Sequence, residues 1–234
     1  MLNEIDRESK NVVSLEDPVE YHVDGVNQSQ VMPEIGYTFA SGLRSILRQD
    51  PDVILVGEIR DKETAALAIQ AALTGHLVLS TLHTNNAAGA IPRLIDMGVD
   101  PFLIAPTLVL AIAQRLAKKT CDDSREEVPM DEATRVMIDK EFADLPAEFR
   151  SKITISDKIV KTVPSKLCPS GTKGRMAVFE MFEVDKDMES VILKSPSELD
   201  IYNATRKKGV LTMREDALIK ALRGDIPLTE IYKF

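Results

Sequence analysis

The stretch Leu47–Asp61 reads LRQDPDVILVGEIRD, and its centre, Val53 to Val56, is a continuous apolar run. A short apolar run bounded by turn residues is typical of a strand that is buried on both faces, as in a parallel sheet. The run ends on Gly57, and an acidic residue, Glu58, follows. Charged residues often follow a strand, so the rest of the chain must decide whether Glu58 has a chemical role.

Short apolar runs alternate with helix-length segments over residues 12–116, which predicts an α/β fold with a parallel sheet. We expect strands at residues 11–17, 52–58 and 76–83, and a hairpin at 20–31 around Asp24-Gly25. Helices are expected at 38–49 with Thr38 as N-cap, at 61–75 ending at Gly75, and around 93–98. An apolar helix interrupted by Pro106 is expected at 101–119.

The second half of the chain has a different texture. Residues 120–175 are polar and weakly periodic, which indicates an insertion on the surface of the α/β unit. A strand is predicted at 174–185, and residues 186–234 are typical of short helices broken at Gly209 and Gly224.

Composition excludes several classes of protein. A net charge of -8 over 234 residues argues against a general nucleic-acid surface. No apolar run approaches the roughly 20 residues that span a bilayer, and residues 1–10 lack the features of a secretory signal, so we expect a cytosolic location. In such a reducing compartment, Cys121 and Cys168 are expected to be free thiols or remnants of a metal site.

Polar residues follow three consecutive predicted strands, and the carboxyl ends of parallel strands share one edge of a sheet, where ligands bind. These residues are Glu16 and Asp17 after the first strand, Glu58 after the second, and Ser80, Thr81, His83 and Thr84 at the third. Grouped carboxylates suit Mg²⁺ binding and the activation of a water molecule. A glycosidase also uses two carboxylates, but Arg44 and Arg48, one helical turn apart, favour an anionic substrate such as a phosphate.

Five stretches carry a resemblance to a known family: VVSLEDPVEY, TFASGLRSILRQDPDVILVGEIRDKETAALAIQAALTGHLVLSTLHTN, AAGAIPRLIDMGVDPF, GRMAVFEMFEV and GVLTMREDALIKALRGDIPLTEI. They resemble the secretion ATPases of type II secretion and type IV pilus assembly. The resemblance implies a RecA-like P-loop NTPase core at residues 1–118, an insertion at 119–175 similar to a degenerate cysteine-motif subdomain, and a C-terminal strand and helical subdomain at 176–234. The pilus-retraction branch is a poorer match because of that insertion.

The resemblance also implies roles for single residues. VVSLEDPVE matches the Asp box of the family, which places Glu16 and Asp17 near the magnesium ion and the phosphates. DVILVGE matches its Walker B strand, whose terminal glutamate, here Glu58, activates the hydrolytic water. TGHLVLSTLHT matches its His box, which makes His76 and His83 sensors of the nucleotide state.

Arginines complete the implied site. Arg44 and Arg48 match positions that neutralise phosphate charge, across a subunit boundary in the ring, and Arg93 and Arg175 are weaker candidates for the same role. His22 lies in the expected hairpin and receives no role from the resemblance.

A phosphate-binding P-loop ends in Gly-Lys, and the 234 residues contain no Gly-Lys dipeptide. SGTKGR has its lysine before the second glycine, so it is not a P-loop. We therefore expect the chain to be the C-terminal part of a longer protein, without the first strand and the P-loop. Relatives often carry two Cys-x-x-Cys pairs that bind zinc, whereas Ser124 stands at the partner spacing from Cys121 and Cys168 has no partner cysteine, so we expect no zinc.

The implied function is that of a homo-hexameric motor that uses ATP and Mg²⁺ to drive the assembly of pilins or pseudopilins. Its implied partner is an inner-membrane platform protein, and its implied location is the cytoplasmic side of that membrane, as a peripheral protein without nucleic acid. The alternative is a non-catalytic remnant that still packs into rings or binds the platform. A nucleic-acid translocase is disfavoured by the acidic composition.

Overall fold

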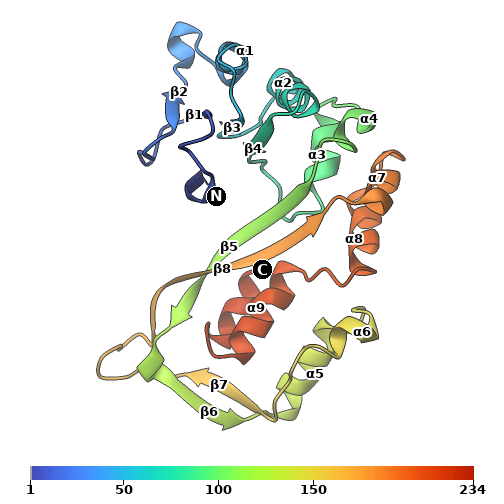
Figure 1. Ribbon diagram of the computed structural model, residues 1–234. Coiled ribbons are helices and arrows are strands. Elements are labelled where there is room, and N and C mark those ends of the chain that lie inside the picture. The colour runs from blue at the N-terminus through green and yellow to red at the C-terminus, as the bar shows by residue number, and fades with distance from the viewer. Residues whose placement is uncertain (1) are drawn as a thin grey trace. The chain divides into compact units, whose positions relative to one another are not determined.

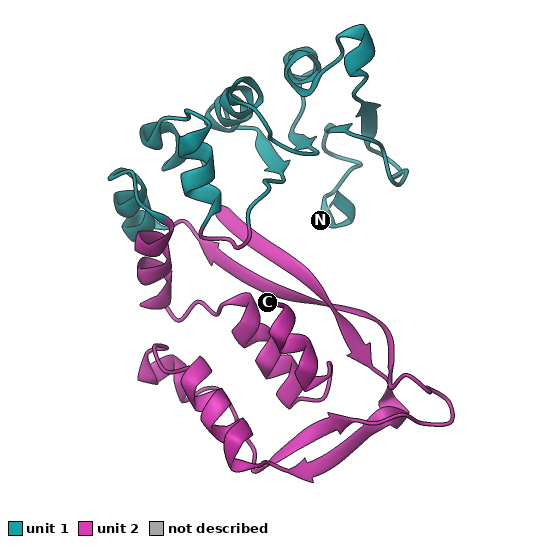
Figure 2. Cartoon of the chain, turned by 180° about the vertical axis from the view of Figure 1, so that it is seen from behind, with its two compact units in different colours: residues 1–84, 89–109, 185–197 teal, residues 85–88, 110–184, 198–234 magenta. Residues whose placement is uncertain are grey.

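A parallel sheet organises the first part of the chain. The computed structural model describes residues 2–234, and the chain divides into two units (Figure 2). Unit 1 comprises residues 1–84, 89–109 and 185–197, and unit 2 comprises residues 85–88, 110–184 and 198–234. Unit 1 contains a four-stranded sheet, unit 2 contains two two-stranded sheets, and each unit has its own helices (Figure 1).

The sheet of unit 1 has the strand order β2-β1-β3-β4, with every pair parallel, which confirms the predicted parallel sheet. Its strands are β1 (Val12–Glu16), β2 (Asn27–Gln30), β3 (Val53–Val56) and β4 (Leu77–Ser80). The two central strands, β1 and β3, are almost completely buried, whereas the edge strands β2 and β4 are half-exposed. The apolar runs of β1 and β3 are therefore central because they are covered on both faces.

Two helices pack beside this sheet, α1 (Phe39–Ile46) and α2 (Lys62–Leu73). Thr38 caps α1 as predicted: its hydroxyl accepts the backbone N–H of Ser41, and the Ser41 hydroxyl accepts the N–H of Thr38. Gly42 lets α1 approach β1, because a Cβ at this position would lie 2.8 Å from a methyl group of Leu15.

The predicted hairpin at residues 20–31 is wrong. Asp24-Gly25 does form a turn, closed by the hydrogen bond from the N–H of Val26 to the carbonyl of Val23, but only β2 follows it, and β2 is parallel to β1. The side-chain amide of Gln28 bonds the carbonyl of Tyr21 and accepts the N–H of Val23. A side chain thus satisfies the backbone groups that a second strand would have paired.

Three further helices belong to unit 1: α3 (Ala90–Asp96), α4 (Pro101–Ile104) and α7 (Lys186–Ile192). The predicted apolar helix at 101–119 is wrong, because α4 ends at Ile104 and β5 (Leu110–Thr120) follows. β5 is antiparallel to β8 (Thr172–Glu183) over most of its length. This long ladder outweighs the helix propensity of the Ala, Leu and Lys residues in β5.

The core of unit 2 lies where β5 and β8 meet the helices α5 (Glu132–Glu141) and α9 (Met213–Leu222). Its buried residues are Ala117, Ile138, Phe142, Leu145, Val178, Ala217, Leu218, Ala221, Ile226 and Ile231. Residues 120–175 were expected to form a polar insertion on the surface. They nevertheless contribute Ile138 of α5 and Phe142, the C-cap of α5, to this core. The remaining elements are β6 (Arg125–Pro129), β7 (Lys158–Thr162), α6 (Ala147–Arg150) and α8 (Glu198–Arg206).

The breaks predicted at Gly209 and Gly224 are confirmed, since both residues have a positive φ and follow helices α8 and α9. Gly209 also faces the ring of Phe149, at 2.3 Å from the position of a Cβ. A side chain at residue 209 would therefore be strained and would overlap the ring.

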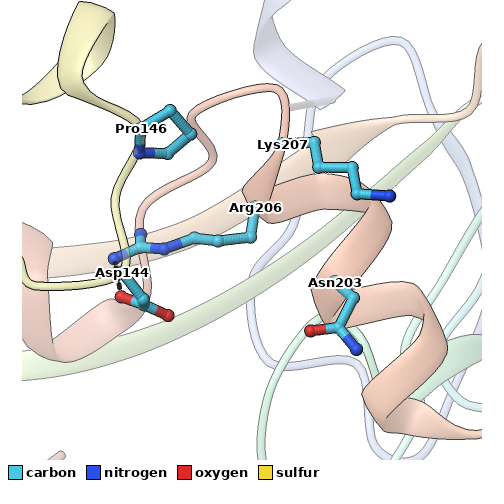
Figure 3. A pocket seen from close by; sticks show the side chains of 5 residues that line it. All are labelled: Asp144, Pro146, Asn203, Arg206 and Lys207. Carbon is cyan, nitrogen blue, oxygen red and sulfur yellow. Dashed lines mark hydrogen bonds and ion pairs between the residues drawn. The ribbon is translucent and has the colours of Figure 1, made fainter.

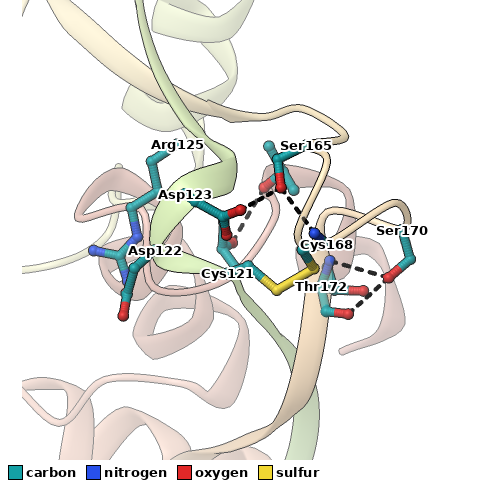
Figure 4. The surroundings of a disulfide bond; sticks show 10 residues. Cys121, Asp122, Asp123, Arg125, Ser165, Cys168, Ser170 and Thr172 are labelled. Atoms are coloured by element: carbon teal, nitrogen blue, oxygen red, sulfur yellow. Dashed lines mark hydrogen bonds and ion pairs between the residues drawn. A yellow bond between two sulfur atoms is a disulfide. The ribbon is translucent and has the colours of Figure 1, made fainter.

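Cys121 and Cys168 form a disulfide, so the prediction of free thiols is wrong (Figure 4). Cys121 follows β5 and Cys168 shortly precedes β8, and the N–H of Cys121 donates to the carbonyl of Gly171. The antiparallel pairing of β5 with β8 brings together two cysteines 47 positions apart in sequence. The hydroxyl of Ser165, which accepts the N–H of Cys168, also bonds Asp123 beside Cys121.

No helix within residues 2–234 has both the length and the apolar character needed to cross a lipid bilayer.

Candidate functional site at the carboxyl edge of the sheet

Hydrogen bonds continue beyond the ends of the central strands and join the three segments that carry the predicted acids and histidine. The N–H of Gly57 donates to the carbonyl of Leu15 at 2.7 Å, and the N–H of Ile59 donates to the carbonyl of Thr81 at 3.0 Å. The Thr81 hydroxyl bonds the carbonyl of Gly57 at 2.7 Å. The carboxyl ends of β1, β3 and β4 therefore form one continuous edge.

Glycine at position 57 allows this close approach. A Cβ there would lie 3.1 Å from the carbonyl oxygen of Leu15 and 3.3 Å from the Cα atom of Glu16. These contacts are tighter than ordinary van der Waals packing, so a larger residue at position 57 would push β1 and β3 apart. The separation would occur at the carboxyl ends of these strands, next to Glu16 and Glu58. This is why the apolar run of β3 ends on glycine before Glu58.

The Glu58 carboxylate lies at the centre of this edge, with a side chain only 12% exposed. Its Oε2 atom is 2.7 Å from Nε of Arg60 and 2.8 Å from Nε2 of His83. Burial alone would raise the pKa of this carboxyl, but the hydrogen bonds and charges of Arg60 and His83 outweigh burial and lower it. Glu58 is thus held as an ionised acceptor, the form that can orient or deprotonate a water molecule.

Arg60 was missed by the sequence reasoning, although its position gave a signal. The segment after β3 is extended, and residues two apart in an extended segment point to the same side, so Glu58 and Arg60 were placed to meet. The side chains of Arg60 and His83 are 62% and 73% exposed. Both are therefore accessible to a ligand that approaches Glu58 from solvent.

Glu16 is positioned by polar neighbours that were also missed. Its Oε1 atom accepts hydrogen bonds from the hydroxyl of Ser14 at 2.7 Å and from the side-chain amide of Gln28 at 2.9 Å. Ser14 is completely buried in β1, and Gln28 belongs to β2. Asp17 is exposed, and its peptide bond to Pro18 is cis. One carboxylate is thus fixed and its neighbour faces solvent.

The predicted arginines are arranged differently from expectation. Helix α1 ends at Ile46, so Arg44 belongs to the helix and Arg48 lies in the turn that follows it. Arg44 forms an ion pair with Glu63 of α2, in which both side chains are more than half exposed. Arg48 is exposed. The α1 cap at Leu47 ends the helix one turn earlier than its sequence pattern indicated.

The structure does not bring His76 to this edge. His76 precedes β4, at the amino end of the strand, and its Nδ1 atom lies 2.8 Å from the carbonyl of Ala71 and 3.0 Å from the hydroxyl of Thr74. The four residues of β4 separate it from the carboxyl end, a length of about 13 Å at ~3.3 Å per residue. Here the imidazole closes the C-terminal turn of α2.

Arg93 is an exposed residue of α3 in unit 1, and Arg175 is an exposed residue of β8 in unit 2.

Magnesium is the metal that the acids were expected to hold. Among residues 2–234, no three His, Cys, Asp or Glu side chains cluster as a metal site. Mg²⁺ usually keeps several waters and takes one or two carboxylates, so the pair Glu16 and Asp17 suits it without a larger cluster. In the disulfide, neither Cys121 nor Cys168 is a thiolate, which is the form that binds zinc.

A separate hollow of about 430 Å³ in unit 2 is lined by Asp144, Pro146, Asn203, Arg206 and Lys207 (Figure 3). The guanidinium of Arg206 in this hollow is already paired with carboxylates. Both terminal nitrogens of Arg206 bond the carboxylate of Glu215, which is 1% exposed, and one also bonds Asp144. This hollow therefore lies over a structural ion pair.

Comparisons with known proteins identify the relatives of this chain. The profile of the family described as "Type II/IV secretion system protein" matches residues 1–233. The chain is 44% identical over 232 residues to the "Type IV pilus assembly ATPase PilB" of Thermus thermophilus, covering 99% of this chain and 25% of that protein. It is 41% identical over 233 residues to the "Type II secretion system protein E" of Aeromonas hydrophila, covering 99% of this chain and 44% of that protein.

Solved structures show the same fold. The pilus retraction motor PilT with bound ADP gives a TM-score of 0.65 at 26% identity, over 96% of this chain and 52% of that chain. The Legionella pneumophila ATPase DotB gives a TM-score of 0.63 at 24% identity, over 98% and 52%. The RecA-like fold class is confirmed.

The chain spans between 25% and 44% of the length of the pilus assembly and type II secretion relatives. The match over its whole length and the identity of more than 40% establish what the resemblance in the sequence indicated. The chain belongs to the family of type II/IV secretion system proteins.

Proposed function

We propose that this chain is the C-terminal portion of a hexameric motor that hydrolyses ATP to drive the assembly of pilins or pseudopilins. The motor acts on the cytoplasmic side of the inner membrane, where it binds a platform protein. The names of the relatives support the motor role. The observation that carries the catalytic part is the contact of Glu58 with His83 at the carboxyl edge of a RecA-like sheet, at 2.8 Å.

Glu58 is the residue that we assign to the hydrolytic water. It is ionised and largely buried, and it lies at the end of a rigid central strand, so it can hold a water in line with a terminal phosphate. Arg60 and His83 both bond its carboxylate. The side chains of Arg60 and His83 are exposed, so a bound phosphate competes with Glu58 for their hydrogen bonds. The Glu58 carboxylate then becomes free to accept a hydrogen bond from the water.

Glu16 and Asp17 are the acids that we assign to Mg²⁺, which neutralises the charge of the phosphates when bound. Glu16 is oriented by Ser14 and Gln28, and Asp17 faces solvent. Arg44, Arg48, Arg93 and Arg175 are assigned to phosphate charge, within a subunit or across a ring interface. Their exposure supports this, and the exposed Arg44–Glu63 pair is weak enough to exchange for a phosphate.

His76 is left out of this site because it lies at the amino end of β4. A sensor role for His76 requires contact with nucleotide from another direction, such as a neighbouring subunit.

The phosphate cradle has to come from outside these 234 residues, since they contain no Gly-Lys dipeptide. The edge strand β4 supports this requirement. Its sequence is apolar, yet Leu77 is 51% exposed, and β4 is hydrogen-bonded only to β3 within the described residues. An apolar open edge is suited to a further parallel strand, which would bring its own loop to the carboxyl edge beside His83.

A chimera tests the proposal. The 234 residues replace the matching segment of the Thermus pilus assembly ATPase, which supplies the missing part, and ATP turnover is measured with a coupled assay. We expect turnover in the chimera, and a loss of at least ~100-fold in Glu58→Gln with binding of a fluorescent ATP analogue retained. The control is Glu8→Gln, an exposed acid of unit 1 that precedes β1 and therefore lies on the side of the amino ends of the strands.

A chimera that binds nucleotide and does not hydrolyse it supports the alternative, a non-catalytic ring or platform-binding remnant. Turnover that is unchanged by Glu58→Gln removes Glu58 from its assigned role.

A further inference from the structure

The segment that follows His83 changes unit and then returns. Residues 85–88 belong to unit 2, whereas Thr84 before them and Gly89 after them belong to unit 1 (Figure 2). Only Thr84 separates His83 from this four-residue segment. Its attachment in unit 2 therefore bears directly on the backbone that carries His83.

One carboxylate holds this segment. Oε1 of Glu180, in the middle of β8, accepts the N–H of Ala87 at 2.8 Å and the N–H of Ala88 at 3.4 Å. Both alanines are buried, so their N–H groups have no ready replacement in water. The side-chain amide of Asn86 also donates to Oε1 of Glu198 in α8, at 2.6 Å.

Glu180 reaches a third element. Its carboxylate also accepts a hydrogen bond from the backbone N–H of Met213, the first residue of α9. The first N–H groups of a helix have no partner within the helix, and the helix dipole favours a negative charge there. A single side chain thus joins the segment after His83 to the start of α9.

Helix α9 is also bonded to β8, so a displacement of its first turn is passed on through these contacts. Asp216 accepts the N–H of Phe179 at 2.8 Å and pairs with Lys220. The first turn also contains Glu215, whose carboxylate receives the N–H of the cap residue Thr212 and the guanidinium of Arg206. The Glu180 hydrogen bonds therefore end in a tightly connected part of unit 2.

The environment of the Glu180 side chain disfavours its ionised form. Burial raises the pKa of Glu180 although three backbone N–H groups lower it, and the nearby charge of Glu198 raises it further. A neutral residue would be accommodated at lower cost. What the anchor requires is a side-chain acceptor at position 180, which the hydrogen bonds to Ala87, Ala88 and Met213 show.

We propose that Glu180 is a positioning residue that anchors residues 85–88 on β8 and couples the state of the His83–Glu58 pair to helix α9. The proposal rests on the proposed function for the state of that pair. When His83 leaves Glu58 for a phosphate, the backbone after it is pulled, and the anchor transmits that displacement to the first turn of α9. Without the anchor, residues 85–88 absorb the displacement and hydrolysis is no longer linked to unit 2.

The anchor is tested in the 234-residue chain by amide hydrogen exchange. We expect the amides of Ala87 and Ala88 to exchange at least ~10-fold faster in Glu180→Ala. Glu180→Gln, which keeps a side-chain acceptor, should stay within about threefold of wild type. Glu183→Ala, an exposed acid of the same strand, is the matched control. Unchanged exchange in Glu180→Ala overturns the anchor.

The coupling is tested by adding His83→Ala. If the anchor transmits displacements, His83→Ala changes exchange at Met213 by at least about threefold in the wild-type background and leaves it unchanged in Glu180→Ala. No change at Met213 in the wild-type background, or an equal change in both backgrounds, overturns the coupling. These readouts do not depend on ATP turnover.

In the chimera, Glu180→Ala is expected to lower kcat for ATP at least ~10-fold with KM within about twofold, and Glu180→Gln to restore most of it. Loss of turnover in Glu58→Gln with normal kcat in Glu180→Ala overturns this inference and leaves the proposed function intact. A chimera without any turnover overturns the proposed function, and the exchange measurements then decide the inference alone.

Discussion

Nε2 of His83 lies 2.8 Å from Oε2 of Glu58, although the two residues are 25 positions apart in sequence. The contact exists because β3 and β4 are parallel neighbours that end at the same edge, and Arg60 adds a second bond to the same oxygen. These two partners keep the carboxylate ionised and oriented.

Removing Arg60 should raise the pKa of Glu58. The pKa of this carboxyl is low because hydrogen bonds and charges outweigh burial, so Arg60→Ala leaves burial and only one partner. A ¹³C NMR titration of the Glu58 carboxyl measures the change. Lys62→Ala, which removes a nearby exposed cation, is the control and should leave the pKa in place. An unchanged pKa in Arg60→Ala contradicts the arrangement.

The isolated 234 residues should bind ATP weakly and turn it over very slowly. They lack the Gly-Lys of a P-loop, and hence the backbone amides and the lysine that hold the β and γ phosphates. A radiolabelled ATP assay and a filter-binding measurement check this, with the chimera as the positive control. Turnover by the isolated chain at the rate of the chimera would show that other residues of this chain hold the phosphates.

Glu180→Gln should stabilise the protein at neutral pH. Because the pKa of Glu180 in the folded state lies above its ordinary value of 4.5, ionisation opposes folding. The penalty is complete above the folded pKa and vanishes below the ordinary value. Glu180 lines a cavity in unit 2 together with three other charged residues: Glu198 on α8, Glu141 on α5 and Arg214 on α9. Glu141 and Arg214 form an ion pair at 3.0 Å.

Thermal unfolding between pH 4 and pH 8 measures this effect. The melting temperature of Glu180→Gln should exceed that of wild type at pH 7, and the two should converge as the pH falls below about 4.5. Glu183→Gln should follow wild type at every pH. A lower melting temperature for Glu180→Gln than for wild type at pH 7 would contradict a raised pKa at Glu180.

Arg206→Ala should destabilise unit 2 by about 3–5 kcal/mol, since it leaves the buried carboxylate of Glu215 without its partner. The double variant Arg206→Met with Glu215→Leu should recover much of this loss, because it replaces both charges by apolar groups. Urea unfolding of the variants measures the difference. A loss well below about 3 kcal/mol in the single variant would show that Glu215 is not buried as an ion.

Reduction of the disulfide should lower the melting temperature. A cross-link that closes a loop of 47 positions stabilises by about 2–4 kcal/mol. The double variant Cys121→Ser with Cys168→Ser should melt near the reduced wild type, and reductant should not change its melting temperature. Metal analysis of the same samples checks the prediction that no zinc is bound.

The sequence predicted those features whose causes are local or repeat along the chain. Thr38, the expected N-cap, defines the start of α1, and the apolar runs of β1 and β3 identify buried parallel strands. Because parallel strands share a carboxyl edge, Glu16, Glu58 and His83 were placed at one edge from sequence alone. The resemblance to a family supplied their roles.

The features that were not predicted depend on partners distant in sequence. β5 was taken for a helix because its ladder with β8 is not visible in its own residues. The same pairing joins Cys121 to Cys168, and no spacing rule indicated that bond. Glu180 was overlooked because its importance comes from amides 92 and 93 positions away. The end of α1 was expected too late, because its C-cap at Leu47 is not visible in the sequence pattern.

The disulfide has a mechanical consequence for a protein of this family. Tension along the main chain from β5 to β8 passes through the bond between Cys121 and Cys168, and the segment between these residues carries none of it. Helix α5, strand β6 and strand β7 lie in that bypassed segment and remain unstretched while their neighbours bear load. Reduction of this one covalent bond would place the whole segment in series with the pulling force.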